Sequence, residues 1–211
     1  MNVLKIDTPD IDKRSTDFIH GRLYIISAPS GAGKTTLCRA VLDHFTDMFY
    51  SVSCTTREIR KGEQDGVDYH FISKDDFRKK IENDSWAEWA EVHGNYYGTD
   101  AGFINKGLAE GNSILLDIDV QGTRQILKKH PDAVTIFVMP PSPDILRERL
   151  EGRGTDSKDA IEKRLKNAEA EIANKDIFRH IVVNDRLSAA VAELISIIDS
   201  YPLTGTSPNV A

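Results

Sequence analysis

The fold is decided by one stretch of sequence, Leu23-Tyr24-Ile25-Ile26-Ser27-Ala28-Pro29-Ser30-Gly31-Ala32-Gly33-Lys34-Thr35-Thr36. Its apolar start, residues 23–26, predicts a buried strand, and the apolar residues after the glycines, from Leu37 to Phe45, recur at helical spacing. A glycine-rich turn that joins a strand to a helix and ends in Gly-Lys-Thr is typical of a phosphate-binding loop. The stretch therefore predicts a strand, a phosphate loop and a helix.

The residue types of this loop suit the phosphates of a nucleoside triphosphate. Glycines let consecutive backbone N–H groups point at phosphate oxygens, and the helix start adds the positive end of its dipole. We expect Lys34 to reach the β- and γ-phosphates and the Thr35 hydroxyl to face Mg²⁺. The general pattern has glycine where this chain has Ala28, so we expect a negative φ in the β region there. The alternative, a glycine-rich turn with an exposed lysine, is rejected on the strand-and-helix context.

The rest of the chain alternates short apolar runs with helical patterns. Further strands are expected at residues 113–118, 133–139 and 180–183, and a last helix is expected around residues 191–198. Short apolar runs separated by helices predict a mostly parallel, buried sheet. The predicted fold class is α/β, a P-loop NTPase fold with a central parallel sheet flanked by helices.

Two insertions interrupt this alternation. Residues 51–104 contain strand candidates at 51–55 and 67–72, which predicts an inserted α+β subdomain. Ser142 with Pro143 predicts the start of a helix in a second, helical insertion, which we interpret as a hinged flap. The predicted organisation is an N-terminal arm 1–20, a domain 21–200 and a tail 201–211. Within the domain we assign the core to 21–50, 113–141 and 168–200, the first insertion to 51–112 and the lid to 142–167.

Composition and charge narrow the class of protein. The 211 residues carry a formal net charge of -6, which argues against a nucleic-acid surface over the whole protein. No stretch approaches the ~18 apolar residues that span a bilayer, and residues 1–20 show no secretory signal. Cys38 and Cys54 form no C-x-x-C pair, which favours a reducing compartment. We expect a cytoplasmic protein without nucleic-acid or membrane partners, whose assembly into a homo-oligomer is left open.

Motifs outside the loop indicate which molecule accepts the phosphoryl group. They are Ser53-Cys54-Thr55-Thr56-Arg57, Arg60, Gly62-Glu63, Asp65-Gly66, Asp68-Tyr69, Phe71, Glu88-Trp89, Asn95-Tyr96-Tyr97-Gly98-Thr99 and Asp117-Ile118-Asp119. Through them the chain, over about residues 21–200, resembles the guanylate kinase family of nucleoside-monophosphate kinases. The resemblance implies that the first insertion binds GMP. It also implies transfer of the γ-phosphoryl group of ATP to GMP and dGMP, giving ADP and GDP, in purine nucleotide metabolism and GMP recycling.

The resemblance also implies a role for each matched residue. GMP would be held by Ser53, Arg57, Arg60, Glu63, Tyr69, Glu88, Tyr97, Thr99 and Asp119. ATP would be held by Ala28, Pro29, Ser30, Gly31, Ala32, Gly33, Lys34, Thr35, Thr36 and Asn184. The catalytic residues would be Lys34, Arg57, Arg153 and Arg164. Magnesium would be held by Thr35 and, through water, by Asp117.

The chemistry of these residue types agrees with a guanine nucleotide. The carboxylates of Glu88 and Asp119 can accept the N–H donors of the guanine N1/N2 edge, whereas adenine presents the opposite polarity. Without the family motif, Glu88 would be interpreted as an exposed helix carboxylate beside Trp86 and Trp89. Asn184 is explained equally well as the N-cap of the last helix.

Two other functions stay open at this stage. One is a non-catalytic interaction module with the same fold, which retention of Lys34, Arg57 and Arg153 argues against. The other is an enzyme with a different acceptor, such as IMP. A GTPase switch would need a motif such as N-K-x-D, and the sequence has none.

Overall fold

A computed structural model describes residues 21–92, 94–152 and 157–201. The predicted arm 1–20, Arg153 and the tail from residue 202 lie outside these residues. Within the part of the chain that the structure describes, no helix is long and apolar enough to cross a membrane.

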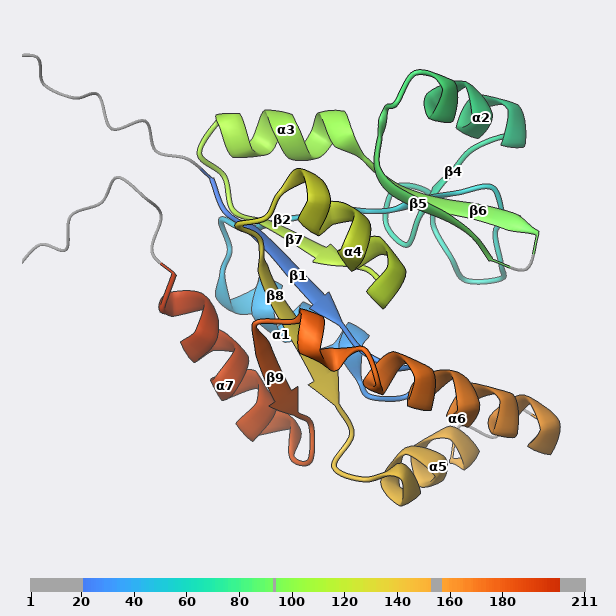
Figure 1. Cartoon of the computed structure of the whole chain (residues 1–211), viewed down its shortest axis with the longest axis vertical. Coiled ribbons are helices and arrows are strands. Elements are labelled where there is room, and N and C mark those ends of the chain that lie inside the picture. The colour runs from blue at the N-terminus through green and yellow to red at the C-terminus, as the bar shows by residue number, and fades with distance from the viewer. Residues whose placement is uncertain (1–20, 93, 153–156, 202–211) are drawn as a thin grey trace, which may run out of the picture.

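The centre of the molecule is a five-stranded sheet (Figure 1). Its strands are β1 (Leu23–Ser27), β2 (Phe49–Tyr50), β7 (Ile114–Asp117), β8 (Val134–Met139) and β9 (His180–Val183). They pair in parallel in the order β2-β7-β1-β8-β9. All five residues of β1 are buried, as an apolar run covered on both faces should be. The predicted α/β class is confirmed, and the predicted core strands lie within two residues of their observed bounds.

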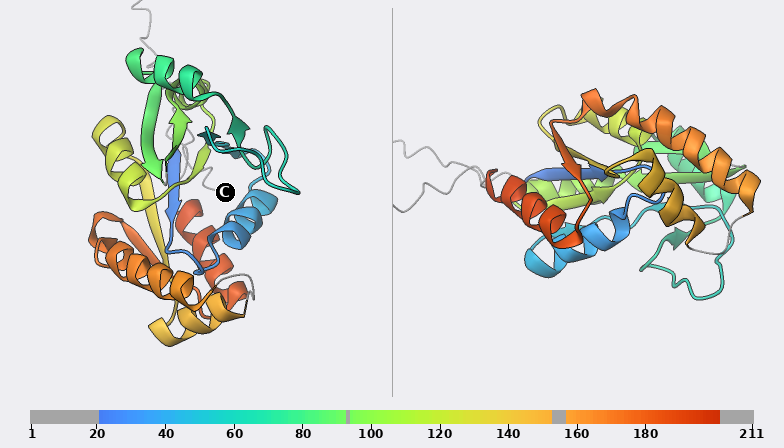
Figure 2. Two further views of the ribbon diagram at one scale, coloured as in Figure 1. Left: turned by 90° about the vertical axis from the view of Figure 1, so that its right-hand side faces the viewer. Right: turned by 90° about the horizontal axis from the view of Figure 1, so that it is seen from below.

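Helices cover both faces of this sheet (Figure 2). On one face α1 (Lys34–His44) and α7 (Leu187–Asp199) share an apolar cluster that includes Leu37, Val41 and Leu194. On the other face α3 (Ala101–Ala109) and α4 (Val120–Lys129) bury Ile104 and Ile126 against β1 and β7. α3 falls inside the predicted insertion 51–112, yet its apolar face packs on the central sheet.

The first insertion builds a second sheet with the order β4-β3-β6-β5. Its elements are β3 (Cys54–Thr55), β4 (His70–Phe71), α2 (Lys74–Glu82), β5 (Trp86–Val92) and β6 (Asn95–Asp100). The Phe77 ring stacks on Trp86 with centroids 4.2 Å apart and forms the core of this unit. The strands expected at 51–55 and 67–72 are only two residues long, Cys54–Thr55 and His70–Phe71. Residues 66–68 form a turn, and Asp65 Oδ1 accepts from the Phe71 N–H across it at 2.8 Å.

The second insertion is a helical pair. α5 (Pro143–Glu151) begins after Ser142, whose Oγ accepts from the Ile145 N–H at 3.2 Å, as the capping prediction requires. α6 (Lys158–Ile172) packs on α5 through a buried cluster that joins Leu146 and Leu150 to Leu165. A short 3₁₀ helix, η1 (Lys175–Ile177), then leads into β9.

Candidate active site

The glycine-rich loop lies at the carboxyl edge of the parallel sheet, where open α/β sheets bind ligands. Gly31 and Gly33 have φ of 97° and 94°, a conformation that favours glycine. A Cβ at Gly31 would lie 2.9 Å from Leu146 Cδ1, and one at Gly33 would lie 2.5 Å from Asn184 Nδ2. Among the described residues Asp84 alone is a non-glycine with positive φ, so Ala28 has the negative φ expected of it.

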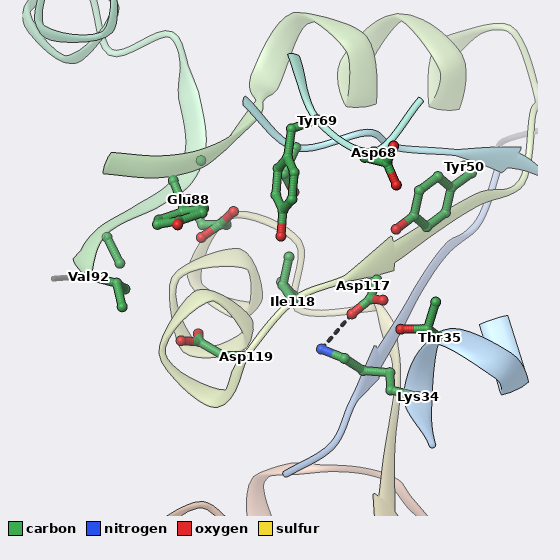
Figure 3. Close-up of a pocket in the computed structure, with 14 residues that line it drawn as sticks. Lys34, Thr35, Tyr50, Asp68, Tyr69, Glu88, Val92, Asp117, Ile118 and Asp119 are labelled. Atoms are coloured by element: carbon green, nitrogen blue, oxygen red, sulfur yellow. Dashed lines mark ion pairs between the residues drawn. The ribbon is translucent and has the colours of Figure 1, made fainter. Parts of the chain in front are cut away.

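Lys34 and Asp117 form an ion pair at the start of α1, with Nζ and Oδ1 2.5 Å apart (Figure 3). Burial lowers the pKa of Lys34, but the charge and hydrogen bond of Asp117 outweigh burial and raise it overall. Thr35 lines the same cavity as Asp117. One hydroxyl and one carboxylate are donors that suit Mg²⁺, which takes few protein ligands and completes its shell with phosphate and water oxygens. The residues therefore fit this ion.

A cavity of about 440 Å³ connects this loop to the first insertion. Eight of the residues predicted from the sequence line it: Lys34, Thr35, Ser53, Tyr69, Glu88, Tyr97, Asp117 and Asp119. They come from α1, from β5, β6 and the residues just before β3 and β4 in the first insertion, from the end of β7 and from the start of α4, so segments distant in the sequence meet at one place. The cavity thus joins a phosphate loop to a second set of polar side chains.

Arg57, Glu63 and two tyrosines form a cluster beside this cavity. The guanidinium of Arg57 binds Glu63 through two hydrogen bonds, Nη1 to Oε2 at 3.0 Å and Nη2 to Oε1 at 2.8 Å. The Glu63 carboxylate raises the pKa of Arg57, and Arg57 lowers the pKa of Glu63. The Arg57 guanidinium also lies 5.5 Å from the centroid of the Tyr69 ring, and Tyr69 packs edge-to-face with Tyr97. A planar cation and two phenols therefore lie together.

Glu88 is buried, with 7% of its surface exposed, and lies on strand β5. The alternative of an exposed helix carboxylate is therefore wrong. A register irregularity in the pairing of β5 with β6 lies between Trp86 and Glu88, and such bulges redirect side chains near sites. Trp86 consequently packs in the core of the insertion, Ala87 packs on the central sheet, and Glu88 lines the cavity.

One hydrogen bond and close packing against Gly122 hold the Glu88 carboxylate in place. The Thr99 hydroxyl donates to Oε1 at 2.6 Å, and a Cβ on Gly122 would lie 2.8 Å from Oε2. Burial, together with the negative charge of Asp119, raises the pKa of Glu88 to about 7 although the Thr99 bonds lower it. Asp119 itself caps α4, with Oδ1 accepting from the Gly122 N–H at 2.8 Å. Two carboxyl groups thus meet at the first turn of α4.

Several predicted residues lie elsewhere. Arg60 is exposed, and its backbone N–H donates to Glu63 Oε2 at 2.8 Å, while Arg164 is half-buried on α6. Asn184 is buried and donates from Nδ2 to the Ala32 carbonyl at 2.8 Å. α7 begins at Leu187 after Arg186, so the N-cap explanation of Asn184 is wrong.

Sequence reasoning gave no role to two polar residues that line the cavity. Tyr50 ends β2, and Figure 3 shows its hydroxyl directed toward Asp117. Asp68 lines the same cavity and accepts from the Gln64 N–H at 2.8 Å. Asp68 lay inside a recognised motif, whereas Tyr50 looked like an ordinary strand residue, and only the three-dimensional arrangement identifies it.

A phosphate loop that faces a second polar cluster across one cavity defines a P-loop phosphotransferase for a phosphorylated small molecule. The family model for guanylate kinase matches residues 20–201, so the chain belongs to the guanylate kinase family.

Known relatives agree with this assignment. The chain is 46% identical over 183 residues to a guanylate kinase of Carboxydothermus hydrogenoformans, covering 87% of this chain and 90% of that protein. It is 50% identical over 178 residues to one of Geobacter sulfurreducens, covering 84% and 88%. A crystal structure of guanylate kinase from Anaplasma phagocytophilum superimposes with a TM-score of 0.67 at 31% identity, covering 86% of each chain. The family phosphorylates GMP with ATP.

Proposed function

We propose that this enzyme binds ATP on the loop 28–36 and GMP or dGMP in the adjoining cavity, and transfers the γ-phosphoryl group between them. The observation that carries the proposal is the cavity of about 440 Å³ that Lys34 and Thr35 share with Tyr69, Glu88 and Asp119. It has a phosphate cradle at one side and two carboxyl groups, the buried Glu88 and the exposed Asp119, at the other. A donor and an acceptor nucleotide would meet between them.

The donor side is supported by the loop geometry. Its backbone N–H groups and the start of α1 would bind phosphate oxygens. Asn184, which donates to the Ala32 carbonyl, would hold the loop in place and lie beside the adenine of ATP. Thr35 directly and Asp117 through water would hold Mg²⁺, which neutralises charge on the β- and γ-phosphates. Lys34 would leave Asp117 for the phosphates of ATP.

The acceptor phosphate would bind to Arg57, Arg60, Tyr69 and Tyr97. Arginine offers a planar fork that matches two phosphate oxygens, and tyrosine hydroxyls donate without adding charge. Glu63 holds both terminal nitrogens of the Arg57 guanidinium beside the Tyr69 ring, so the acceptor phosphate would take the place of this carboxylate. No general base is required, because a nucleotide phosphate with a second pKa near 6 is already largely ionised at pH 7.

The guanine base would be recognised by Glu88 and Asp119, with Ser53 and Thr99 beside them. A buried, ionised carboxylate accepts the N1–H and N2–H donors of guanine, and would be left unpaired against adenine. Thr99 already donates to one oxygen of Glu88, which leaves the other to the base. This arrangement supports GMP over AMP.

The helical pair α5–α6 would act as a lid that brings Arg164, together with Arg153, over the transferred phosphoryl group. Leu146 and Leu150 of α5 lie close to the loop at Gly31, so a movement of the helical pair would shift the loop that is proposed to bind the phosphates. Closure would also exclude water, which competes with GMP as an acceptor.

The chain's two cysteines support a reducing compartment such as the cytoplasm. Cys38 and Cys54 are both buried free thiols, and burial raises the pKa of Cys54 to about 11. In that compartment the enzyme would return GMP and dGMP to the diphosphate pool of purine metabolism.

The test is ADP formation in a coupled assay with ATP and Mg²⁺, in which GMP, dGMP, AMP, CMP and UMP are compared as acceptors. Turnover with GMP and dGMP alone supports the guanine site, and equal turnover with AMP contradicts it. Turnover without any acceptor would indicate an ATPase. Absence of turnover with every acceptor would favour an interaction module.

A further inference from the structure

Helix α4 lies along the outer edge of strand β5. The order β4-β3-β6-β5 leaves the far side of β5 without a neighbouring strand. Gly122, Gln125 and Lys129 occur on α4 at spacings of three and four residues, which places them on one helix face. This face covers the edge of β5 that would otherwise expose unpaired backbone groups.

Gln125 replaces the missing strand at one residue of β5. Its Nε2 donates to the Trp89 carbonyl at 2.9 Å, and its Oε1 accepts from the Trp89 N–H at 3.2 Å. One side-chain amide therefore satisfies both backbone groups of the residue that follows Glu88. One helical turn further on, Lys129 Nζ donates to the Trp86 carbonyl at 2.8 Å.

These bonds fix the position of strand β5 relative to helix α4. In this position the Glu88 carboxylate lies against Gly122, so closely that a Cβ added to the glycine would be only 2.8 Å from Oε2. Asp119 caps the same helical turn through the Gly122 N–H. The separation of the two carboxyl groups therefore depends on the contacts between α4 and β5. Among these contacts, the bonds of Gln125 are made to Trp89, the residue next to Glu88.

We propose that Gln125 is a positioning residue for guanine recognition, which fixes Glu88 relative to Asp119 by its two bonds to the Trp89 backbone. The inference rests on the proposed function, in which both carboxyl groups bind the base. Gln125 does not line the cavity proposed to bind GMP. It acts through the strand, because two acceptors can meet the N1 and N2 donors of one base only if their spacing is held to a fraction of an ångström.

The test compares Gln125→Met with Lys129→Met, a matched control that removes a bond between the same helix and the same strand. The KM and kcat for GMP, the KM for ATP, and the thermal midpoint are measured for both variants. IMP, which lacks the 2-amino group, is measured beside GMP, because the ratio of their kcat/KM values reports on the N2 contact. Glu88→Gln is measured in the same assay as a reference for loss of the guanine contact.

For Gln125→Met we expect a rise in the KM for GMP of roughly tenfold, the effect of about one lost hydrogen-bonded contact, and a lower preference for GMP over IMP. The KM for ATP should stay at the wild-type value. Lys129→Met should lower the thermal midpoint and leave the preference for GMP unchanged. If Gln125→Met fails to fold, Gln125→Glu, which keeps the acceptor for the Trp89 N–H and loses the donor, should show the same rise in KM.

A wild-type preference for GMP in a folded Gln125 variant would overturn the inference, and so would an equal loss of preference in Lys129→Met. These results differ from failure of the proposed guanine site. That failure would appear as an unchanged GMP preference in Glu88→Gln itself.

Discussion

The substitution Glu88→Gln should change the pH dependence of stability. Burial and the charge of Asp119 raise the pKa of Glu88 from its ordinary 4.5 to about 7. Below pH 4.5 the carboxyl is protonated in both the folded and the unfolded chain, so its favourable contribution is fully present. As pH rises toward 7 and beyond, the unfolded chain ionises more readily, and the folded state loses up to about 3 kcal/mol. Glutamine has no such loss, so the variant should be the more stable protein at pH 8.

The same substitution should act with the opposite sign on GMP. The ionised carboxylate accepts the N–H donors of guanine, so protonation of Glu88 competes with the base. For one group with a pKa of about 7, the affinity for GMP should fall roughly tenfold between pH 8 and pH 6. The GMP phosphate also titrates near pH 6, but that contribution is common to both proteins. Glu88→Gln should therefore bind GMP weakly at pH 8 and show only the smaller slope of the phosphate.

Both effects are measurable on one pair of proteins. Urea unfolding followed by circular dichroism at pH 5 and pH 8 gives the difference in stability, and calorimetric titration with GMP from pH 6 to pH 8 gives the affinity. The reasoning is refuted if wild type and Glu88→Gln lose affinity for GMP with the same slope. It is also refuted if the variant gains no stability, relative to wild type, between pH 5 and pH 8.

Three further substitutions test other parts of the site. Lys34→Ala should lower kcat at least ~10²-fold while the calorimetric affinity for GMP stays near wild type, because Lys34 is proposed to contact only the donor; normal turnover would contradict this. Asn184→Ala removes the 2.8 Å bond to the Ala32 carbonyl, so it should raise the KM for ATP and lower stability by about 1 kcal/mol; an unchanged KM for ATP would exclude a role for Asn184 in holding the loop. Gly122→Ala places a Cβ 2.8 Å from Glu88 Oε2, so the crowding, worth about 1–3 kcal/mol, should raise the KM for GMP and not for ATP.

The core of the fold was predictable because its signals are local. The apolar run 23–26, the glycines and Gly-Lys-Thr specify a strand, a turn and a helix without reference to the rest of the chain. Ser142 and Pro143 specify a helix start in the same way, and the structure has one there. Parallel pairing then follows from the short apolar runs that alternate with helices.

The second sheet was less predictable because its geometry depends on distant residues. Trp86-Ala87-Glu88-Trp89-Ala90 fits a helix or a strand by its apolar pattern, and only pairing with β6 decides for a strand. The burial of Glu88 depends on Gly122, and the edge of β5 is completed by Gln125, both far along the chain. No local signal marks Gln125, since an exposed glutamine on a helix face would look the same.

The charges of the site explain how a protein with a net charge of -6 can bind two phosphorylated nucleotides. Lys34 and Arg57, the cations proposed to bind phosphate, each form an ion pair with a carboxylate, Asp117 and Glu63 respectively. These pairs hold long cationic side chains in place, so little rotamer freedom remains to be lost when phosphate arrives. Under the proposed function, binding would exchange one anion for another, and Asp117, the carboxylate that Lys34 would leave, would then hold the water shell of Mg²⁺. The acidic residues would therefore organise the phosphate site instead of opposing it, and the net charge of the chain gives no measure of the local field that a nucleotide would meet.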